Sequence, residues 1–486
     1  MIDRMVEILA YNPDEPMMVN SGLFWVLFII FLPFYAMLRH RKRTVMVMYV
    51  VLFSLYFYYK ASGLFCLLLL SRALIDFYLV KMMAKKEHGN YRKILFAISL
   101  ILSLGLLVYF KYSDFIVFNW DMLLGLNFQP MDMIMPIGLS FYTFQSASYI
   151  IDVYRKRTLP ARSVLDYLFY LSFFPTVVAG PIVRAGEFLP QIYQRKKITE
   201  KKVFGGFFLI MVGLVKKAIV ADYLSTYNNL VFSMPESFNG FECLMGVLGF
   251  SVQIYCDFSG YSDIAIGLGS ILGFDLGKNF ESPYRATNIS DFWRRWHISL
   301  SSWLRDYVYI PLGGNQKGVT RMCFNIMVTM AIGGIWHGAG WNFLIWGSLH
   351  GFGIVIDKIK VLHWDRSSGN VFLKMVAWFS TFLFVSALWI FFRMDSLSGS
   401  LLVFEKIFLQ FNTDFIGAFL NNRLILVVVL LVSLVAMLIP RRFYSTLERA
   451  YLKMGWVIKL ILFVILVQII LEFSNSQVAP FIYSQF

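Results

Sequence analysis

Apolar runs as long as a membrane helix recur along the whole chain, and short polar or basic stretches separate them. A helix that crosses a bilayer needs about 20 mainly apolar residues. By that measure the pattern predicts an all-α, polytopic membrane protein with roughly 11–14 transmembrane or re-entrant helices. The candidate segments are 22–38, 45–60, 63–83, 94–111, 133–151, 164–180, 204–222, 241–256, 262–274, 322–337, 340–358, 371–392, 424–440 and 455–473.

Several of these segments are short or interrupted by glycine and proline. Examples are "MPIGLSFYTF" (135–144) and "FFPTVVAGPIV" (173–183). Irregular backbone is tolerated at membrane depth only where protein or water satisfies its polar groups. Such pieces are therefore interpreted as half-helices or re-entrant segments.

The composition supports a membrane protein and argues against a soluble one. Of the 486 residues, 58% are hydrophobic and 15% are charged, whereas soluble domains carry about 25% charged residues. The net charge of +15 is explained by basic cytoplasmic loops, so nucleic-acid binding is not expected. No cysteine pair has metal-ligand spacing, so the cysteines are interpreted as small buried hydrophobes. They are Cys66, Cys243, Cys256 and Cys323.

The loop charges predict an orientation. Acidic residues precede the first apolar segment, and the basic run 39–43 follows it. Basic residues return at 81–86 and 154–162, two segments apart each time. Under the positive-inside rule the N-terminus then lies outside and these basic loops lie in the cytoplasm. The acidic residues are Asp3, Glu7, Asp14 and Glu15.

The chain is interpreted as a single membrane domain over residues 1–486. Within it we expect N-terminal helices over 1–110, a core that carries the active site over 130–395, and C-terminal helices over 396–486.

The stretch "ISDFWRRWHISLSSWLRDYVYIPLGGN" (289–315) concentrates cations and tryptophans in an apolar chain. A continuous helix over 291–310 would place a polar and an aromatic stripe side by side. One interpretation is an interfacial helix on the cytosolic leaflet. The other is a rim that receives an anionic substrate, because arginine binds phosphate in a bidentate way. The polar stripe consists of Arg294, His297, Ser301 and Arg305, and the aromatic one of Trp296, Leu300, Trp303 and Tyr307.

A second histidine lies in the apolar, glycine-rich stretch "AIGGIWHGAGWNFLIWGSLHG" (331–351). Burial disfavours the imidazolium form, so His337 is expected to stay neutral, as a general base must. The alternative is a histidine that only hydrogen-bonds a neighbouring backbone, and this alternative also applies to His350. The spacing of His297, His337 and His350 does not suit a metal site.

A further polar run in an apolar setting is "YCDFSGYSDIAIG" (255–267). Asp257 and Tyr261 are one helical turn apart, as are Ser259 and Asp263. These side chains fit hydrogen bonding between helices around Gly260. They also fit the polar wall of a reaction channel.

Two motifs resemble the membrane-bound O-acyltransferase superfamily. They are "FWRRWHISLSSWLRDYVYIPLGG" (292–314) and "GGIWHGAGWNFLIWGSLHG" (333–351). The resemblance is to the branch that contains the alginate O-acetyltransferase membrane subunit. It implies a ring of helices around a pinched channel, a catalytic role for His337 and an important role for His297.

The same resemblance implies a bacterial inner-membrane enzyme that takes acetyl groups from cytosolic acetyl-CoA, with no tightly bound cofactor. The acetyl group would pass to an extracytoplasmic partner protein and then to a polysaccharide, with membrane lipids around the chain. The residues expected near the donor are Arg294, Arg295, Arg305, Trp296 and Ser301. The residues expected along the channel wall are Asp257, Tyr261, Asp263, Trp336, Asn342 and His350.

Several alternatives remain open from the sequence. Subunits that acetylate peptidoglycan, cellulose or other exopolysaccharides resemble this chain, and the D-alanyl transferases of teichoic acid share the histidine of the second motif. Two rivals of other classes are a transporter of an acylated or lipid-linked sugar and a scaffold of a polysaccharide export complex.

Overall fold

The computed structural model describes most of the chain as helices, and it shows no strand within the residues that it describes. Asp3 and Glu7, which entered the prediction of orientation, lie outside those residues. The described residues are 9–86, 88–125, 129, 131, 133–194, 197–359 and 370–473.

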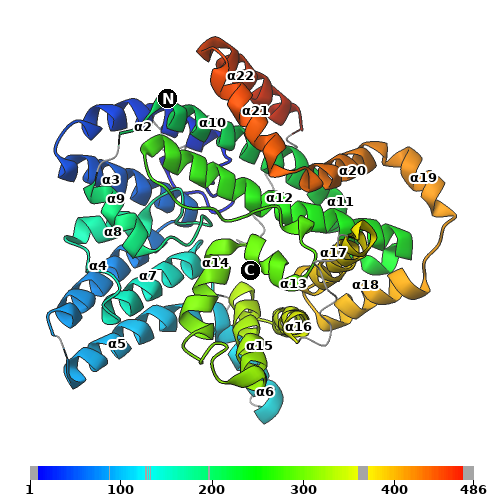
Figure 1. Ribbon diagram of the computed structural model, residues 1–486, viewed down its shortest axis with the longest axis horizontal. Helices are drawn as coiled ribbons and strands as arrows, with labels where there is room; N and C mark the ends of the chain where they lie inside the picture. Colours follow the sequence, from blue (N-terminus) through cyan, green and yellow to red (C-terminus); the bar gives the residue numbers. More distant parts are fainter. Residues whose placement is uncertain are drawn as a thin grey trace. The chain divides into compact units, whose positions relative to one another are not determined.

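The chain divides into two compact units. The first contains the described residues up to Ile210 together with Ile264–Gly277. Its helices α3, α4, α5 and α7 lie side by side, and α8 packs against α3 and α4 (Figure 1). Its elements are α2 (Gly22–Arg39), α3 (Arg43–Ser62), α4 (Phe65–Ala84), α5 (Asn90–Leu107), the π-helical turn η1 (Val108–Tyr112), α6 (Ser113–Leu124), α7 (Leu139–Tyr154), α8 (Val164–Ser172), α9 (Ala185–Tyr193) and most of α10 (Glu200–Leu214).

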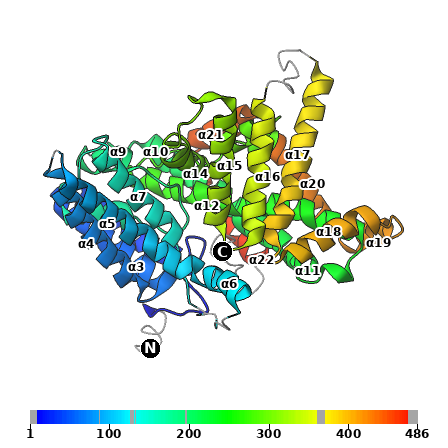
Figure 2. The ribbon, with the colours of Figure 1, turned by 90° about the horizontal axis from the view of Figure 1, so that it is seen from below.

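The second unit contains Met211–Asp263 and the described residues from Lys278 onward. Here α15, α16 and α17 lie side by side, as Figure 2 shows. The elements are η2 (Val215–Ala221), α11 (Asp222–Ser233), η3 (Pro235–Ser237), most of α12 (Gly240–Leu272), η4 (Pro283–Arg285), α13 (Ile289–Arg295), α14 (Ile298–Leu304), η5 (Arg305–Tyr309), α15 (Gly318–His337), α16 (Trp341–Lys358), α17 (Val371–Arg393), α18 (Leu397–Leu409), α19 (Phe415–Asn422), α20 (Leu424–Leu438), α21 (Arg441–Lys453) and α22 (Trp456–Phe473).

The helical, membrane-spanning character predicted from the apolar runs is confirmed. In the described part of the chain, seven helices are long and apolar enough to cross a membrane, or eight if the bent pair α19–α20 forms one span. The segments predicted at 241–256 and 262–274 were wrong as separate spans. They form the single helix α12, because Gly260 between them allows a close helix contact and does not end the helix.

The interrupted segment 173–183 is irregular, as its prolines and glycine suggested. Helix α8 ends at Ser172, and the residues that follow are buried but not helical. Local bonds satisfy part of this backbone: the Thr176 amide donates to the Phe173 carbonyl at 2.9 Å, and the Phe174 amide donates to Ser54 Oγ at 3.2 Å. Protein groups therefore replace part of the missing helical bonds, which is how irregular backbone is tolerated within a membrane.

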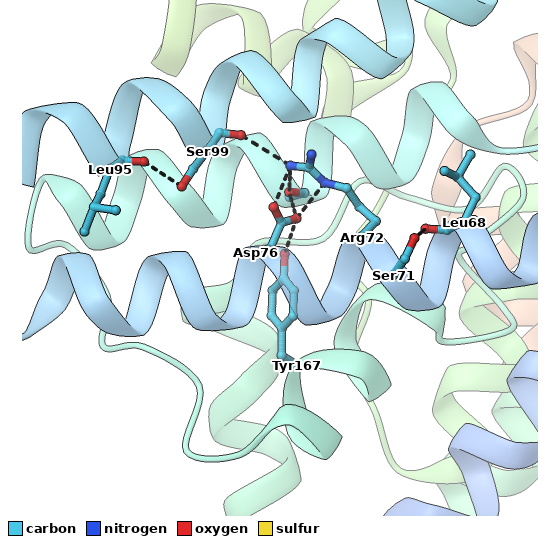
Figure 3. A network of polar contacts seen from close by, with 8 residues as sticks. Leu68, Ser71, Arg72, Asp76, Leu95, Ser99 and Tyr167 are labelled. Carbon is cyan, nitrogen blue, oxygen red and sulfur yellow. Dashed lines mark hydrogen bonds and ion pairs between the residues drawn. The ribbon is translucent and has the colours of Figure 1, made fainter.

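A buried polar cluster holds four helices of the first unit together (Figure 3). Arg72 and Asp76 of α4 form an ion pair, with Nε to Oδ2 at 2.9 Å. Asp76 Oδ2 also accepts from the hydroxyls of Ser146 (α7) and Tyr167 (α8), the latter at 3.2 Å. The Arg72 guanidinium donates to the Ser99 carbonyl of α5 at 3.4 Å. We call these five residues the Arg72 cluster.

Candidate active site

The cluster at 289–315 is not one helix. Helix α13 ends at Arg295 and α14 begins at Ile298, so the chain breaks at Trp296 and His297. The prediction of a continuous helix over 291–310 was therefore wrong. The physical reason is the backbone of His297, whose φ of 41° and ψ of 56° lie in the left-handed region.

This break turns the His297 side chain inward. Its ring is fully buried, at 0% exposure. The ring centroid lies 4.6 Å from that of Phe258 on α12 and 6.5 Å from that of Phe280, which is nearly parallel to it. Burial lowers the pKa of His297 to about 3, because the apolar surroundings disfavour imidazolium. The ring is therefore neutral at physiological pH.

His337 is the last residue of α15, at the turn into α16. These two helices approach closely where Gly334 faces Gly347, since a Cβ added to Gly334 would lie 2.2 Å from the Phe343 carbonyl oxygen. The side chain of His337 is 2% exposed. Its ring centroid lies 5.1 Å from that of Trp346 and 5.3 Å from that of Phe392.

The structure brings the two motif histidines together. The ring centroids of His297 and His337 are 6.4 Å apart. Trp336 lies against both rings, at 5.9 Å from His297 and 4.9 Å from His337. Two imidazoles at this separation can act on neighbouring atoms of one reacting group. We refer to His297 and His337 as the histidine pair.

The predicted polar stripe does not exist as one surface, because the break at His297 separates its members. Arg294 and Arg305 are exposed, whereas His297 is buried. Arg295 pairs with Asp291 at 2.8 Å, and Arg305 pairs with Asp306 at 2.8 Å. Arg294 has no ion-pair partner among the residues that the structure describes, so it is the arginine whose charge a bound anion could meet most directly.

Ser301 and Trp296 belong to the scaffold around the break. The Ser301 hydroxyl donates to the Trp296 carbonyl at 3.1 Å. The Trp296 ring is fully buried, 5.1 Å from that of Phe280 and 5.1 Å from that of Trp389. Both residues therefore shape the turn that carries His297.

His350 lies a little more than two helical turns after the start of α16. The ring of Trp346 contacts both His350 and His337. The ring of His350 is fully buried and stacks parallel to Phe292 at 6.0 Å. Asn342, at the start of α16, donates to the Met394 carbonyl at 2.7 Å. That bond fixes the turn after His337 to the end of α17.

The acidic residues of α12 meet two lysines that sequence reasoning did not single out. Lys217 of η2 pairs with Asp257 at 2.6 Å and with Asp222 at 2.7 Å, and Lys216 pairs with Asp263 at 2.6 Å. Tyr261 is buried one turn after Asp257. Two lysines within an apolar segment are a signal that could have been used, since ionisable residues in membrane helices are costly.

Within the described residues, no three His, Cys, Asp or Glu side chains are placed to hold a metal ion. The four cysteines are free thiols.

A family model described as the membrane-bound O-acyltransferase family matches residues 154–397, about half of the chain. This range contains both histidines and the turns that carry them. The chain belongs to the membrane-bound O-acyltransferase family. It is thus a multi-pass membrane protein and an O-acyltransferase, and the resemblance seen in the two motifs is confirmed.

Relatives within this family carry different names. The chain is 34% identical over 384 residues to the peptidoglycan O-acetyltransferase of Helicobacter pylori, covering 74% of this chain and 73% of that protein. It is 41% identical over 298 residues to a Pseudomonas putida protein named "Probable alginate O-acetylase AlgI", covering 60% of each chain. The teichoic acid D-alanyltransferase of Bacillus subtilis is 29% identical over 239 residues, or 46% of this chain and 58% of that protein.

Proposed function

We propose that this membrane O-acyltransferase takes an acetyl group from cytosolic acetyl-CoA and delivers it across the membrane for O-acetylation of an extracytoplasmic polysaccharide. The observation that carries the proposal is the histidine pair, buried among aromatic rings with centroids 6.4 Å apart. The names of the relatives support acetyl as the acyl group.

In the proposed reaction His337 is the general base. It takes the proton of an acceptor hydroxyl as that oxygen attacks the thioester carbonyl carbon. The carbon–sulfur bond breaks, and the leaving thiolate receives the proton from the His337 imidazolium. His297 orients the thioester or stabilises the charge on its carbonyl oxygen. General base catalysis supplies about 10²–10⁴-fold, and positioning contributes much of the rest.

Exposed arginines are the proposed contact for the phosphates of the donor. Arg294 is exposed, and the side chain of Arg305 is 62% exposed despite its pairing with Asp306. Guanidinium groups bind phosphate oxygens in a bidentate way. Arg295, already paired with Asp291, contributes less in this proposal.

The proposed setting is the bacterial inner membrane, with the N-terminus outside and the basic loops in the cytoplasm. The donor then arrives on the basic side. An extracytoplasmic partner protein receives the acetyl group and passes it to the polymer. Alginate and peptidoglycan are the two candidate polymers, because relatives named for each match this chain over more than half of its length.

The test is acetyl transfer by the purified protein in detergent. Radiolabelled acetyl-CoA is offered with alginate oligosaccharides or with peptidoglycan fragments, each with and without an extract that supplies the extracytoplasmic partner protein, or with no acceptor. We expect thioester loss that depends on His337 and label on one of the acceptors. Thioester loss that survives His337→Ala would contradict the role of the histidine.

Two further arms separate the rival functions. A D-alanyl carrier protein thioester tests the branch represented by the Bacillus subtilis relative. Vesicles with reconstituted protein test sugar transport without acyl transfer. Transport that persists in the His337→Ala variant, with no labelled product in any arm, would favour a transporter over the proposed enzyme.

A further inference from the structure

An extended segment that precedes η4 runs beside the break that carries His297. The Ile298 amide donates to the Asn279 carbonyl at 2.9 Å, and the Glu281 amide donates to the Arg295 carbonyl at 2.9 Å. These two backbone bonds lie on either side of His297. The segment around Asn279 therefore holds both ends of the turn.

The side chain of Asn279 adds three hydrogen bonds to this contact. Its Oδ1 accepts from Ser299 Oγ at 2.9 Å and from the Ser299 amide at 3.3 Å. Its Nδ2 donates to Ser262 Oγ on α12 at 3.0 Å. Asn279 is 1% exposed. One buried amide thus ties the start of α14 to helix α12.

The backbone of His297 must be restrained to keep its conformation. A residue with a side chain rarely adopts the left-handed conformation of His297, and such a conformation persists only where the surroundings over-determine it. The ring contacts help, since Phe258 and Phe280 both face His297. Phe258 belongs to α12, which the Asn279 side chain bonds, and Phe280 directly follows Asn279 in the chain.

We propose that Asn279 is a positioning residue that holds His297 in its orientation toward His337. It bonds Ile298 and Ser299, the two residues that follow His297, and acts on the reaction only through that histidine. The kinetic part of this proposal rests on the proposed function, whereas the positioning itself does not. Loss of the side-chain amide of Asn279 should lower kcat about 10–100-fold with little change in KM for acetyl-CoA. A small displacement of His297 from its position in the site is enough for a loss of that size.

The first experiment measures the restraint without any acyl transfer. Diethyl pyrocarbonate modifies accessible neutral histidines, and mass spectrometry reports the modification of each histidine separately. In the wild-type protein His297 and His350 should both resist, because both are fully buried. In Asn279→Ala, His297 should react severalfold faster while His350 stays protected.

The variants have matched controls. Asn228→Ala also removes a buried amide in this unit, but that amide bonds Gln253 and not the His297 turn. It should leave the protection of His297 unchanged. Asn279→Asp keeps acceptors for Ser299 and can accept from the Ser262 hydroxyl, so it should restore much of the protection. If Asn279→Ala does not fold, Ser299→Ala removes one of the three bonds and gives the same readout.

The second experiment is a double-mutant cycle in acetyl transfer. Asn279→Ala should lower kcat in the wild-type background and have no further effect in a His297→Ala background. Additive effects of Asn279→Ala and His297→Ala on kcat would mean that Asn279 only supports the fold. Equal rates of modification of His297 and His350 in the Asn279→Ala variant would mean the same. Either result would overturn the proposal. A wild-type protein with no acetyl transfer would refute the proposed function, and the modification experiment would still decide the role of Asn279.

Discussion

The Arg72 cluster and the histidine pair both bury polar side chains among apolar helices, but in different ways. In the first unit, a guanidinium and a carboxylate neutralise each other, and three further polar groups bond to them. In the second unit, His297 and His337 are surrounded mainly by aromatic rings.

Under the proposed function, the difference separates a structural role from a chemical one. A buried ion pair is tolerable only when both charges remain together, so its members are committed to each other. A neutral imidazole in apolar surroundings keeps a nitrogen that can take up a proton during a reaction. The four predictions below test this distinction.

The largest expected effect is on activity at the histidine pair. His337→Ala should lower acetyl transfer by about 10²–10⁴-fold, because the proposed general base is lost. Its melting temperature in detergent should fall less than that of the Arg72→Met variant described next, since the lost side chain is a neutral ring in the proposed mechanism. His40→Ala, at an exposed position after α2, is the control and should retain full activity. A His337→Ala protein that melts early would assign this histidine a structural role instead.

The second prediction concerns the Arg72 cluster. Arg72→Met leaves Asp76 buried without its partner, which should lower the free energy of unfolding by about 3–5 kcal/mol. The amount of folded protein should fall, while the activity per folded molecule is retained. The double variant Arg72→Met, Asp76→Leu removes both charges and should recover most of the lost stability. Denaturation in detergent, followed by circular dichroism, measures the free energy of unfolding of the single and the double variant. Equal stability of the single and double variants would contradict the role of the ion pair.

The third prediction concerns the helix contact behind His337. A Cβ added to Gly347 would lie 2.3 Å from the Met330 carbonyl oxygen, so α15 and α16 could not keep their spacing. Gly347→Ala should therefore cost about 1–3 kcal/mol of stability and lower the activity of the folded fraction. Gly417→Ala is the control, because nothing lies within 4 Å of an added Cβ there. A Gly347→Ala protein as active and stable as the control would show that this contact does not position His337.

The sequence predicted the features that depend on long apolar runs. Helices such as α3, α15 and α17 begin and end within a few residues of the predicted segments, because an apolar run about as long as a bilayer crossing leaves little choice of structure. The histidines were identified for a similar reason, since an ionisable group is conspicuous in an apolar stretch.

Features that depend on contacts between distant segments could not be predicted in this way. The break at His297 is maintained by bonds to Asn279, and nothing in the local pattern of 289–315 signals it. The same limit applied to Arg72 and Asp76. Their place in the predicted membrane segment 63–83 could have singled them out, but only the contacts with Ser146 and Tyr167 show which other helices the pair joins.

The smallest effect concerns the pH dependence of stability. The pKa of His297 is lowered to about 3 by burial, whereas an unfolded histidine has a pKa of about 6.5. Below pH 6.5 this histidine binds a proton in the unfolded state but remains unprotonated in the folded state. The free energy of unfolding therefore falls as the pH drops from 6.5 toward 3. At pH 5.5 the expected loss relative to pH 8 is about 1.4 kcal/mol. His297→Gln lacks this titration, so the difference in unfolding free energy between the two proteins should change by that amount between pH 8 and 5.5. A difference independent of pH would mean that a partner stabilises the His297 imidazolium, and the contrast with the Arg72 cluster would then fail.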